Sequence, residues 1–182
     1  MFNLLTETGV IRDDGARTLS YFCTEENVRV GNSVIEQLLQ VSANNGDCDV
    51  RLCLHPSPEE SFHQMIILQH GLRPYHRPHK HASKPESCTI IKGKLGFFVF
   101  NDNGHVISSH ELEEGRDTIV RIGDDQWHTI IPISPYAIYQ ESKPGPYLGV
   151  SDSIFPLWAP EDESSPEALD YARNTLRILT HA

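Results

Sequence analysis

The chain has 182 residues, of which 38% are hydrophobic and 22% are charged, and its formal net charge is −10. This length predicts one domain with a substantial core. The acidic balance argues against a nucleic-acid partner and against anionic membrane surfaces, since both attract basic faces. Twelve glycines and twelve prolines favour a turn-rich β-protein over a helical one.

The sequence also indicates a compartment. No segment approaches the ~20 apolar residues of a membrane span. The opening Met-Phe-Asn-Leu-Leu-Thr-Glu lacks the basic start and the long apolar run of a signal peptide. The four cysteines show no C-x-x-C spacing, so reduced thiols packed as small apolar groups are expected. We therefore expect a cytoplasmic protein.

The first sixty residues predict two short strands and a helix. Residues 9–11 and 19–22 are extended candidates on either side of a turn-forming Asp-Asp-Gly run. Ser33 with Glu36 three positions later has the capping-box pattern, and apolar residues follow at helical spacing, which predicts a helix over 34–43. Pro58 after Ser57 predicts a further short helical start.

The middle of the chain reads as a series of short strands. The alternation of apolar and polar residues predicts strands at 51–55, 62–69, 86–92, 95–100, 105–112, 118–122, 127–131 and 136–141. Asn103-Gly104 is a tight-turn signal, and the proline-rich stretches 132–135 and 143–146 are read as turns. Short strands at this spacing predict a double-sheet jelly roll.

The tail changes character at residue 161. An acidic, serine-rich linker precedes Ser165-Pro166, which opens an amphipathic helix. Leu169, Ala172, Leu176 and Leu179 lie on or near one face of that helix. We expect a single domain over 1–160, and a segment over 161–182 whose helix packs on the barrel.

Three histidines and a glutamate carry the clearest chemical signal. His79 and His81 alternate, so on an extended chain both side chains point to one face. Glu86 begins the next predicted strand, and His128 begins a later one. Imidazoles with a carboxylate suit a divalent ion such as Fe, Mn, Co, Ni, Cu or Zn. We hypothesise that His79, His81, Glu86 and His128 bind one such ion. The other interpretation is surface or hydrogen-bonded core histidines.

The arrangement resembles the first cupin motif, in which a glycine precedes His-x-His, a glutamate follows, and six residues separate the glutamate from a second glycine, here Gly93. The likeness narrows to the WbuC-type cupin metalloproteins over about 34–160. It is carried by Arg77-Pro-His-Lys-His81, Lys84-Pro-Glu-Ser87, the hairpin 97–104, Trp127-His-Thr129, Lys143-Pro-Gly-Pro-Tyr147 and Trp158-Ala-Pro160.

The resemblance implies a cupin double-stranded β-helix with an N-terminal helix and a C-terminal amphipathic helix. It implies that the same four residues are the metal ligands. It also implies a link to surface-polysaccharide (O-antigen) metabolism and a homodimer. Two departures stand out: Gly71 lies eight residues before His79 rather than six, and Gly123 and Asp125 replace the usual Pro-x-Gly before the later histidine.

Other polar residues are candidates for ligand binding. Between 73 and 94, six basic residues stand against Glu86 alone. Arg73, Arg77 or Lys84 could attract an anionic ligand to the mouth of the site; the alternative is ordinary solvated charge. Arg51, His55 and Tyr139 are candidates for lining the pocket or for catalysis, with structural hydrogen bonding or core packing as the alternative.

The sequence therefore predicts a metal-binding cupin that takes a small, polar, sugar-derived or anionic molecule. If it is an enzyme, an isomerase or epimerase, a lyase or a dioxygenase would suit a cupin metal. A non-catalytic, metal-dependent saccharide-binding module and a structural metal are the alternatives. The sequence identifies neither the metal nor the substrate.

Overall fold

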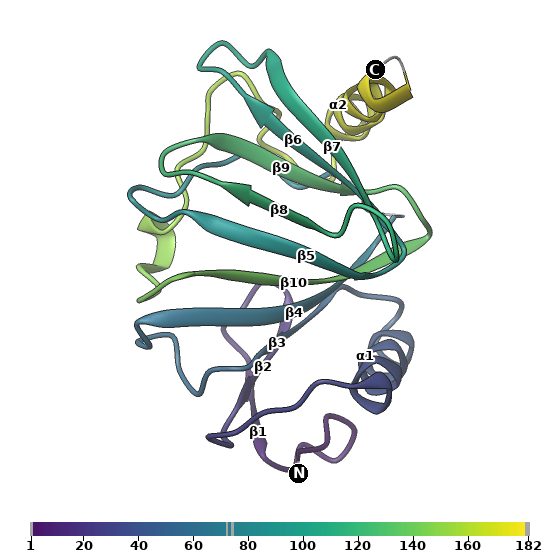
Figure 1. The fold of residues 1–182 in the computed structure, drawn as a ribbon, viewed down its shortest axis with the longest axis vertical. Helices are drawn as coiled ribbons and strands as arrows, with labels where there is room; N and C mark the ends of the chain where they lie inside the picture. Colours follow the sequence, from purple (N-terminus) through teal and green to yellow (C-terminus); the bar gives the residue numbers. More distant parts are fainter. Residues whose placement is uncertain (1, 72, 74, 181–182) are drawn as a thin grey trace.

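The computed structural model describes residues 2–71, 73 and 75–180. The described residues form two β-sheets with a helix toward each end of the chain (Figure 1). The larger sheet has the strand order β1-β2-β3-β4-β10-β5-β8, and the smaller has β7-β6-β9. The strands are β1 (Val10–Asp13), β2 (Leu19–Cys23), β3 (Val50–Cys53), β4 (Phe62–His70), β5 (Glu86–Lys92), β6 (Lys94–Phe100), β7 (Val106–Glu113), β8 (Ile119–Ile122), β9 (Trp127–Pro132) and β10 (Tyr136–Pro144).

The two sheets face each other across an apolar core. Alternate residues of the strands point inward, among them Leu95 and Phe97 of β6 and Ile90 of β5, and all three are almost fully buried. The strand pairs are antiparallel except β2 with β3. The fold is thus mainly β, a double-stranded β-helix of the cupin type, as the sequence predicts.

Helix α1 (Asn32–Asn44) covers the outer face of the larger sheet. Its apolar side packs against Leu52, Ile66 and Leu68. The predicted capping box is wrong: the N-cap is Gly31, whose carbonyl accepts from the amides of Val34 and Ile35, and no side chain caps the helix. Because the helix begins before Ser33, that residue lies inside its first turn rather than at the cap.

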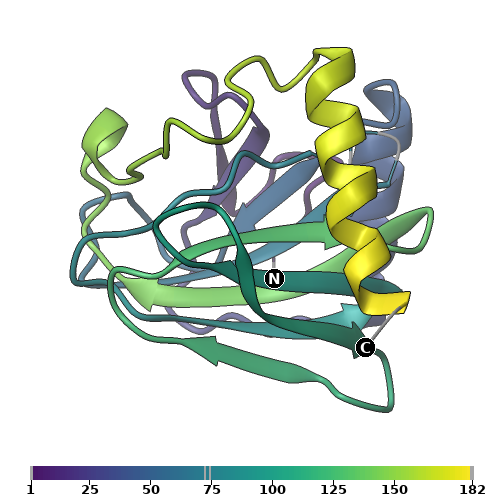
Figure 2. The same cartoon turned by 90° about the horizontal axis from the view of Figure 1, so that it is seen from above.

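Helix α2 (Pro166–Arg177) covers the outer face of the smaller sheet (Figure 2). Ser165 caps it by accepting a hydrogen bond from the amide of Ala168 at 3.1 Å. Ala168 and Ala172 are fully buried against a cluster that includes Phe98 and Ile131. The two helices lie well apart along the molecule's long axis, and each covers one sheet (Figure 1).

Two segments differ from their sequence predictions. Residues 57–60 form a bend and a turn rather than a helical start, because the chain must reverse there to bring β4 antiparallel to β3. Strand β10 does not stop at 141: it runs to Pro144 and pairs with β4 along its whole length. Proline is tolerated at the end of a strand because its missing N–H lies where the ladder ends.

The remaining short elements are the 3-10 helices η1 (Gly149–Ser151) and η2 (Ile178–Thr180). Within the described residues, neither α1 nor α2 combines the length and the apolar character needed to cross a lipid bilayer.

Candidate metal centre

Three separate parts of the fold bring the predicted ligands together. His79 and His128 lie opposite each other, since the amide of each donates to the carbonyl of the other, at 3.0 and 2.8 Å. His81 lies two residues further along the same extended segment, and Glu86 is the first residue of β5. The candidate coordinating nitrogens of the three histidines all lie within 4.8 Å of one another.

Backbone carbonyls fix the protonation of all three imidazole rings. Nδ1 of His79 lies 3.1 Å from the carbonyl of Arg77, Nδ1 of His81 lies 2.6 Å from that of Asp152, and Nδ1 of His128 lies 2.9 Å from that of Gln126. A carbonyl only accepts, so each Nδ1 carries a proton. In the neutral ring, Nε2 then keeps its lone pair for a metal, the usual outer-shell arrangement of a metal-binding histidine.

Glu86 adds a buried negative charge. Its Oε1 lies 2.9 Å from Nε2 of His128, and its Oε2 lies 3.5 Å from Nε2 of His81. Neither Oε2 of Glu86 nor Nε2 of His128 has a hydrogen-bond partner, although both atoms are buried. Buried polar atoms without partners are costly, and a cation among them would satisfy both. The residues present therefore fit a bound metal ion.

Burial and neighbouring charges shift the pKa of each of the four candidate ligands from its ordinary value. Burial, followed by the neighbouring His128 and His81, holds the pKa of His79 well below its usual range. Burial alone would raise the pKa of Glu86, but His128 and Lys143 hold it below its ordinary value. Burial likewise opposes a charge on His128, yet the Glu86 carboxylate raises the pKa of that ring. A carboxylate that stays ionised, beside imidazoles whose Nδ1 protons are held by backbone carbonyls, is a suitable set of metal donors.

Sequence reasoning missed Lys143. Its Nζ lies 3.0 Å from Nε2 of His81, 3.2 Å from Oε1 of Glu141 and 4.0 Å from Oε2 of Glu86. Burial disfavours its charge, but Glu141 and Glu86 raise its pKa. The 143–146 stretch was expected to be a turn. Lys143 lies on the inner face because β10 continues to Pro144. Continuing the alternation of the predicted strand past residue 141 would have placed Lys143 on that face.

The predicted ligand-binding arginines and lysine lie outside the group of four. Lys84 donates to the carbonyl of Pro146 at 2.6 Å and to the carboxylate of Asp152. Arg77 lies over the ring of Phe155 and donates to the carbonyl of Pro156 at 3.2 Å. Both therefore fasten the segment after β10 beside the centre. Arg73 is exposed and lies just after the end of β4. Lys143 pairs with His63 at the opposite end of that strand.

The pocket-lining candidates also have structural partners. Tyr139 is buried in the core between the sheets, and its hydroxyl donates to Oε1 of Gln69 at 3.1 Å. The ring of His55 stacks on His63 with centroids 4.2 Å apart, and its Nδ1 contacts the backbone of Gln64. Arg51 lies on β3, and its Nε is buried without a hydrogen-bond partner. The four predicted metal ligands thus come together, whereas these three do not contact them in the interactions described.

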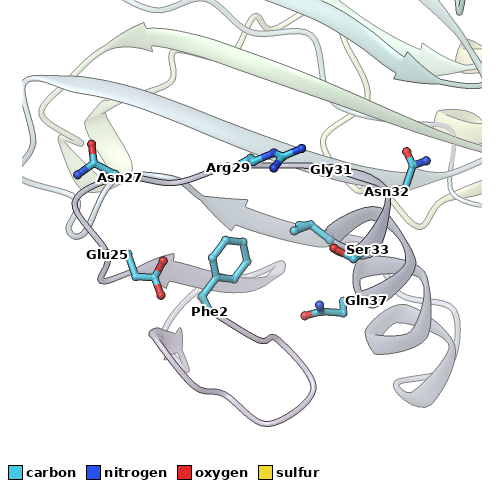
Figure 3. A pocket seen from close by; sticks show the side chains of 9 residues that line it. Phe2, Glu25, Asn27, Arg29, Gly31, Asn32, Ser33 and Gln37 are labelled. Atoms are coloured by element: carbon cyan, nitrogen blue, oxygen red, sulfur yellow. The ribbon is translucent and has the colours of Figure 1, made fainter.

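A separate hollow of about 470 Å³ lies between the N-terminal segment and the start of α1 (Figure 3). Phe2, Arg29 and Gln37 are among the residues that line it. It opens on the far side of the larger sheet from the inner core and contains none of the metal-ligand candidates. The donors that suit a metal ion converge at the histidine cluster and not at this hollow.

A family model described as "Domain of unknown function (DUF6016)" matches residues 30–112. A search of curated proteins finds no match. The strand order given above is that of two sheets packed as a jelly roll.

Several solved structures are similar in fold. The oxalate decarboxylase of Bacillus subtilis at pH 4.6 is 12% identical, with a TM-score of 0.46, over 59% of this chain and 27% of that chain. The formate complex of the Lactobacillus farciminis oxalate decarboxylase is 18% identical, with a TM-score of 0.42, over 53% and 27%. An HTH_3 family transcriptional regulator from Vibrio cholerae is 18% identical, with a TM-score of 0.40, over 54% and 52%. The match thus spans about half or less of each of these chains.

Proposed function

We propose that the protein is a divalent-metal-binding cupin whose ion is held by His79, His81, Glu86 and His128. The supporting observation is the convergence of three Nε2 lone pairs, each defined by an Nδ1 bond to a carbonyl, on a buried carboxylate with an unpartnered oxygen. When bound, a metal of the Fe, Mn, Co, Ni, Cu or Zn group would act as a Lewis acid toward a ligand oxygen. Four protein donors leave about two positions of an octahedral ion open.

The ligand that we propose is a small polar or anionic molecule. Glu86, His81 and His128 are at most 4% exposed, so a bulky group would not reach the ion. The resemblance to WbuC-type cupins supports a sugar-derived ligand linked to surface-polysaccharide metabolism, in a cytoplasmic homodimer. Isomerase or epimerase, lyase and dioxygenase chemistry are the reaction classes that such an ion would suit.

A non-catalytic, metal-dependent saccharide-binding module is the second candidate. One observation favours it: the hydroxyl of Tyr139, a candidate catalytic residue, donates to Gln69 inside the core instead of facing the histidines. A turnover assay with nucleotide sugars and small keto acids separates the two. Tight binding of a compound that is never converted supports the module, and conversion supports an enzyme.

Metal analysis tests the proposed centre directly. We expect one ion per chain in the purified protein, and a loss of metal affinity of at least about a hundredfold in Glu86→Gln and in His79→Ala, measured by competition with a chelator. His105→Ala is the matched control, because His105 is exposed and lies in the turn before β7. Equal metal content in all three variants would refute the assignment.

A further inference from the structure

Lys143 is a mostly buried ammonium that faces the proposed ion. Alternation along β10 puts Tyr139, Glu141 and Lys143 on its inner face, with Lys143 nearest the histidines. Its three described neighbours are Nε2 of His81, Oε1 of Glu141 and Oε2 of Glu86, at 3.0, 3.2 and 4.0 Å. The side chain of Lys143 is only 13% exposed.

Metal binding would remove two of these three neighbours. An ammonium has three N–H donors and no acceptor. A metal ion held by His81 and Glu86 would occupy the lone pair and the carboxylate that Lys143 now faces. Glu141 would then be the one remaining acceptor among the contacts described, and buried charged donors without acceptors are strongly unfavourable. The loaded site would therefore need another acceptor beside Lys143.

The charges of the loaded site favour an anion as that acceptor. Lys84 and Asp152 form a pair whose charges cancel. A divalent ion and Lys143, set against Glu86 and Glu141, leave one net positive charge in a buried place. A buried uncompensated charge is costly, and a monoanionic ligand would neutralise it. A carboxylate can bridge the two cations, with one oxygen toward the ion and the other toward the ammonium.

We propose that Lys143 is a ligand-binding residue that recognises the carboxylate of a small monoanionic acid coordinated to the ion. Glu141 is the positioning residue, since it holds the ammonium at the edge of the centre. The ligand class is a short acid with a second oxygen beside its carboxylate, such as a 2-oxo acid, because this geometry lets one molecule contact both cations. This inference rests on the proposed metal centre and specifies what that centre binds.

The test compares pyruvate with its neutral counterpart pyruvamide. Both can present two neighbouring oxygens to a metal, but only pyruvate carries the negative charge. Wild type and Lys143→Met are loaded with Co²⁺, metal content is confirmed, and the affinity for each compound is measured by calorimetry. We expect the preference for pyruvate over pyruvamide to fall about ten- to a hundredfold in Lys143→Met while the ion is retained.

Two further variants control for indirect effects. Lys80→Met removes the same charge from between two ligands, but Nζ of Lys80 lies over the ring of Trp127, 4.6 Å from its centroid. We expect that variant to keep the wild-type preference within about twofold. Lys143→Gln keeps a polar side chain that can donate to Glu141 but removes the charge, so we expect it to lose the preference as Lys143→Met does. Its preference for pyruvate tests the proposal if Lys143→Met fails to fold.

The outcomes separate this inference from the metal centre itself. A wild-type protein that binds no ion overturns both. A wild-type protein that binds Co²⁺ but shows no preference for pyruvate overturns the role of Lys143 and leaves the metal centre standing. The same holds if Lys143→Met, or Lys143→Gln in its place, binds the ion and keeps the full preference.

Discussion

The three histidines of the candidate centre are oriented by main-chain carbonyls. For His79 and His128, the carbonyl belongs to the residue two positions earlier, so the local extended path of each segment sets the ring. His81 depends on Asp152, which is remote in sequence and is itself bonded to Lys84. The segment after β10 thus takes part in the site by fixing one ring, although it supplies no metal ligand.

Gly93 illustrates a second residue-level constraint. Its φ is +84°, and an added Cβ would lie 2.5 Å from the carbonyl oxygen of Tyr136. We expect Gly93→Ala to lower the free energy of unfolding by about 3 kcal/mol, combining left-handed strain with forced movement of β10. Urea unfolding measures this. Gly46→Ala isolates the strain, since its φ is +76° with open space around it, and should cost about 1 kcal/mol. Equal losses in the two variants would contradict the clash.

His55 gives the protein a defined acid sensitivity. Burial, and then the positive charge that His63 can carry, lowers the pKa of His55 to about 4 from an ordinary value of 6.5. Between these values the unfolded chain binds a proton that the folded chain does not. The free energy of unfolding should therefore fall as the pH drops from 6.5 toward 4, and this contribution should level off below 4.

The variant His55→Phe tests this assignment in the metal-free protein. It keeps a flat ring against His63 but cannot titrate. Urea midpoints measured from pH 7 to pH 4 should fall less steeply than in wild type. The difference between the two slopes removes the contribution of the other histidines. Parallel curves would show that His55 does not carry the effect.

At the scale of elements, the cap of α2 decides how firmly that helix covers the smaller sheet. Ser165→Ala removes the side-chain oxygen that accepts from the amide of Ala168, so the free energy of unfolding should fall by about 1 kcal/mol. Thermal unfolding followed by circular dichroism measures it. Among the described residues, the neighbouring Ser164 bonds through its side chain to Asp162 in the exposed linker, so Ser164→Ala should change stability by less than about 0.5 kcal/mol.

Strand positions were predictable from the sequence wherever alternation faced a buried core. Strand β5 begins at Glu86 and ends at Lys92, as predicted, because buried and partly exposed residues alternate along it from Glu86 to Ile91. The end of β10 was not predictable in the same way. Two prolines near Lys143 are typical of a turn, whereas pairing with Phe62 and His63 of β4 keeps the chain extended. Pairing partners distant in sequence are what local patterns cannot supply.

The sequence predicted the convergence of the candidate metal ligands but not which charged residues lie beside them. The spacing of His79, His81 and Glu86 implied convergence, and the structure brings these residues together with His128. The charge run over 73–94 suggested ligand-binding residues, yet Arg77 and Lys84 have local structural partners. Net charge in a stretch of sequence does not say which side chains face inward, because that depends on the tertiary fold.

At the scale of the whole molecule, the fold and the proposed ion contribute separately to stability. The core between the sheets is built from apolar residues such as Leu95, Phe97 and Ile130, which need no metal to pack. We therefore expect that removing the ion with a chelator leaves the far-ultraviolet circular dichroism spectrum unchanged. Collapse of that spectrum on chelation would instead identify a purely structural metal.

An ion that binds only the folded state should still raise the melting temperature. At a free metal concentration of one hundred times Kd the stabilisation is about 2.7 kcal/mol, which for a chain of this size corresponds to roughly 5–11 °C. Thermal scans of the metal-free protein at increasing Co²⁺ concentration measure the shift, which should keep growing with concentration. In Glu86→Gln the shift should be absent over the same range, because the negative ligand is lost while the core is untouched. A wild-type melting temperature that does not change with Co²⁺ concentration would mean that the four side chains converge without binding an ion.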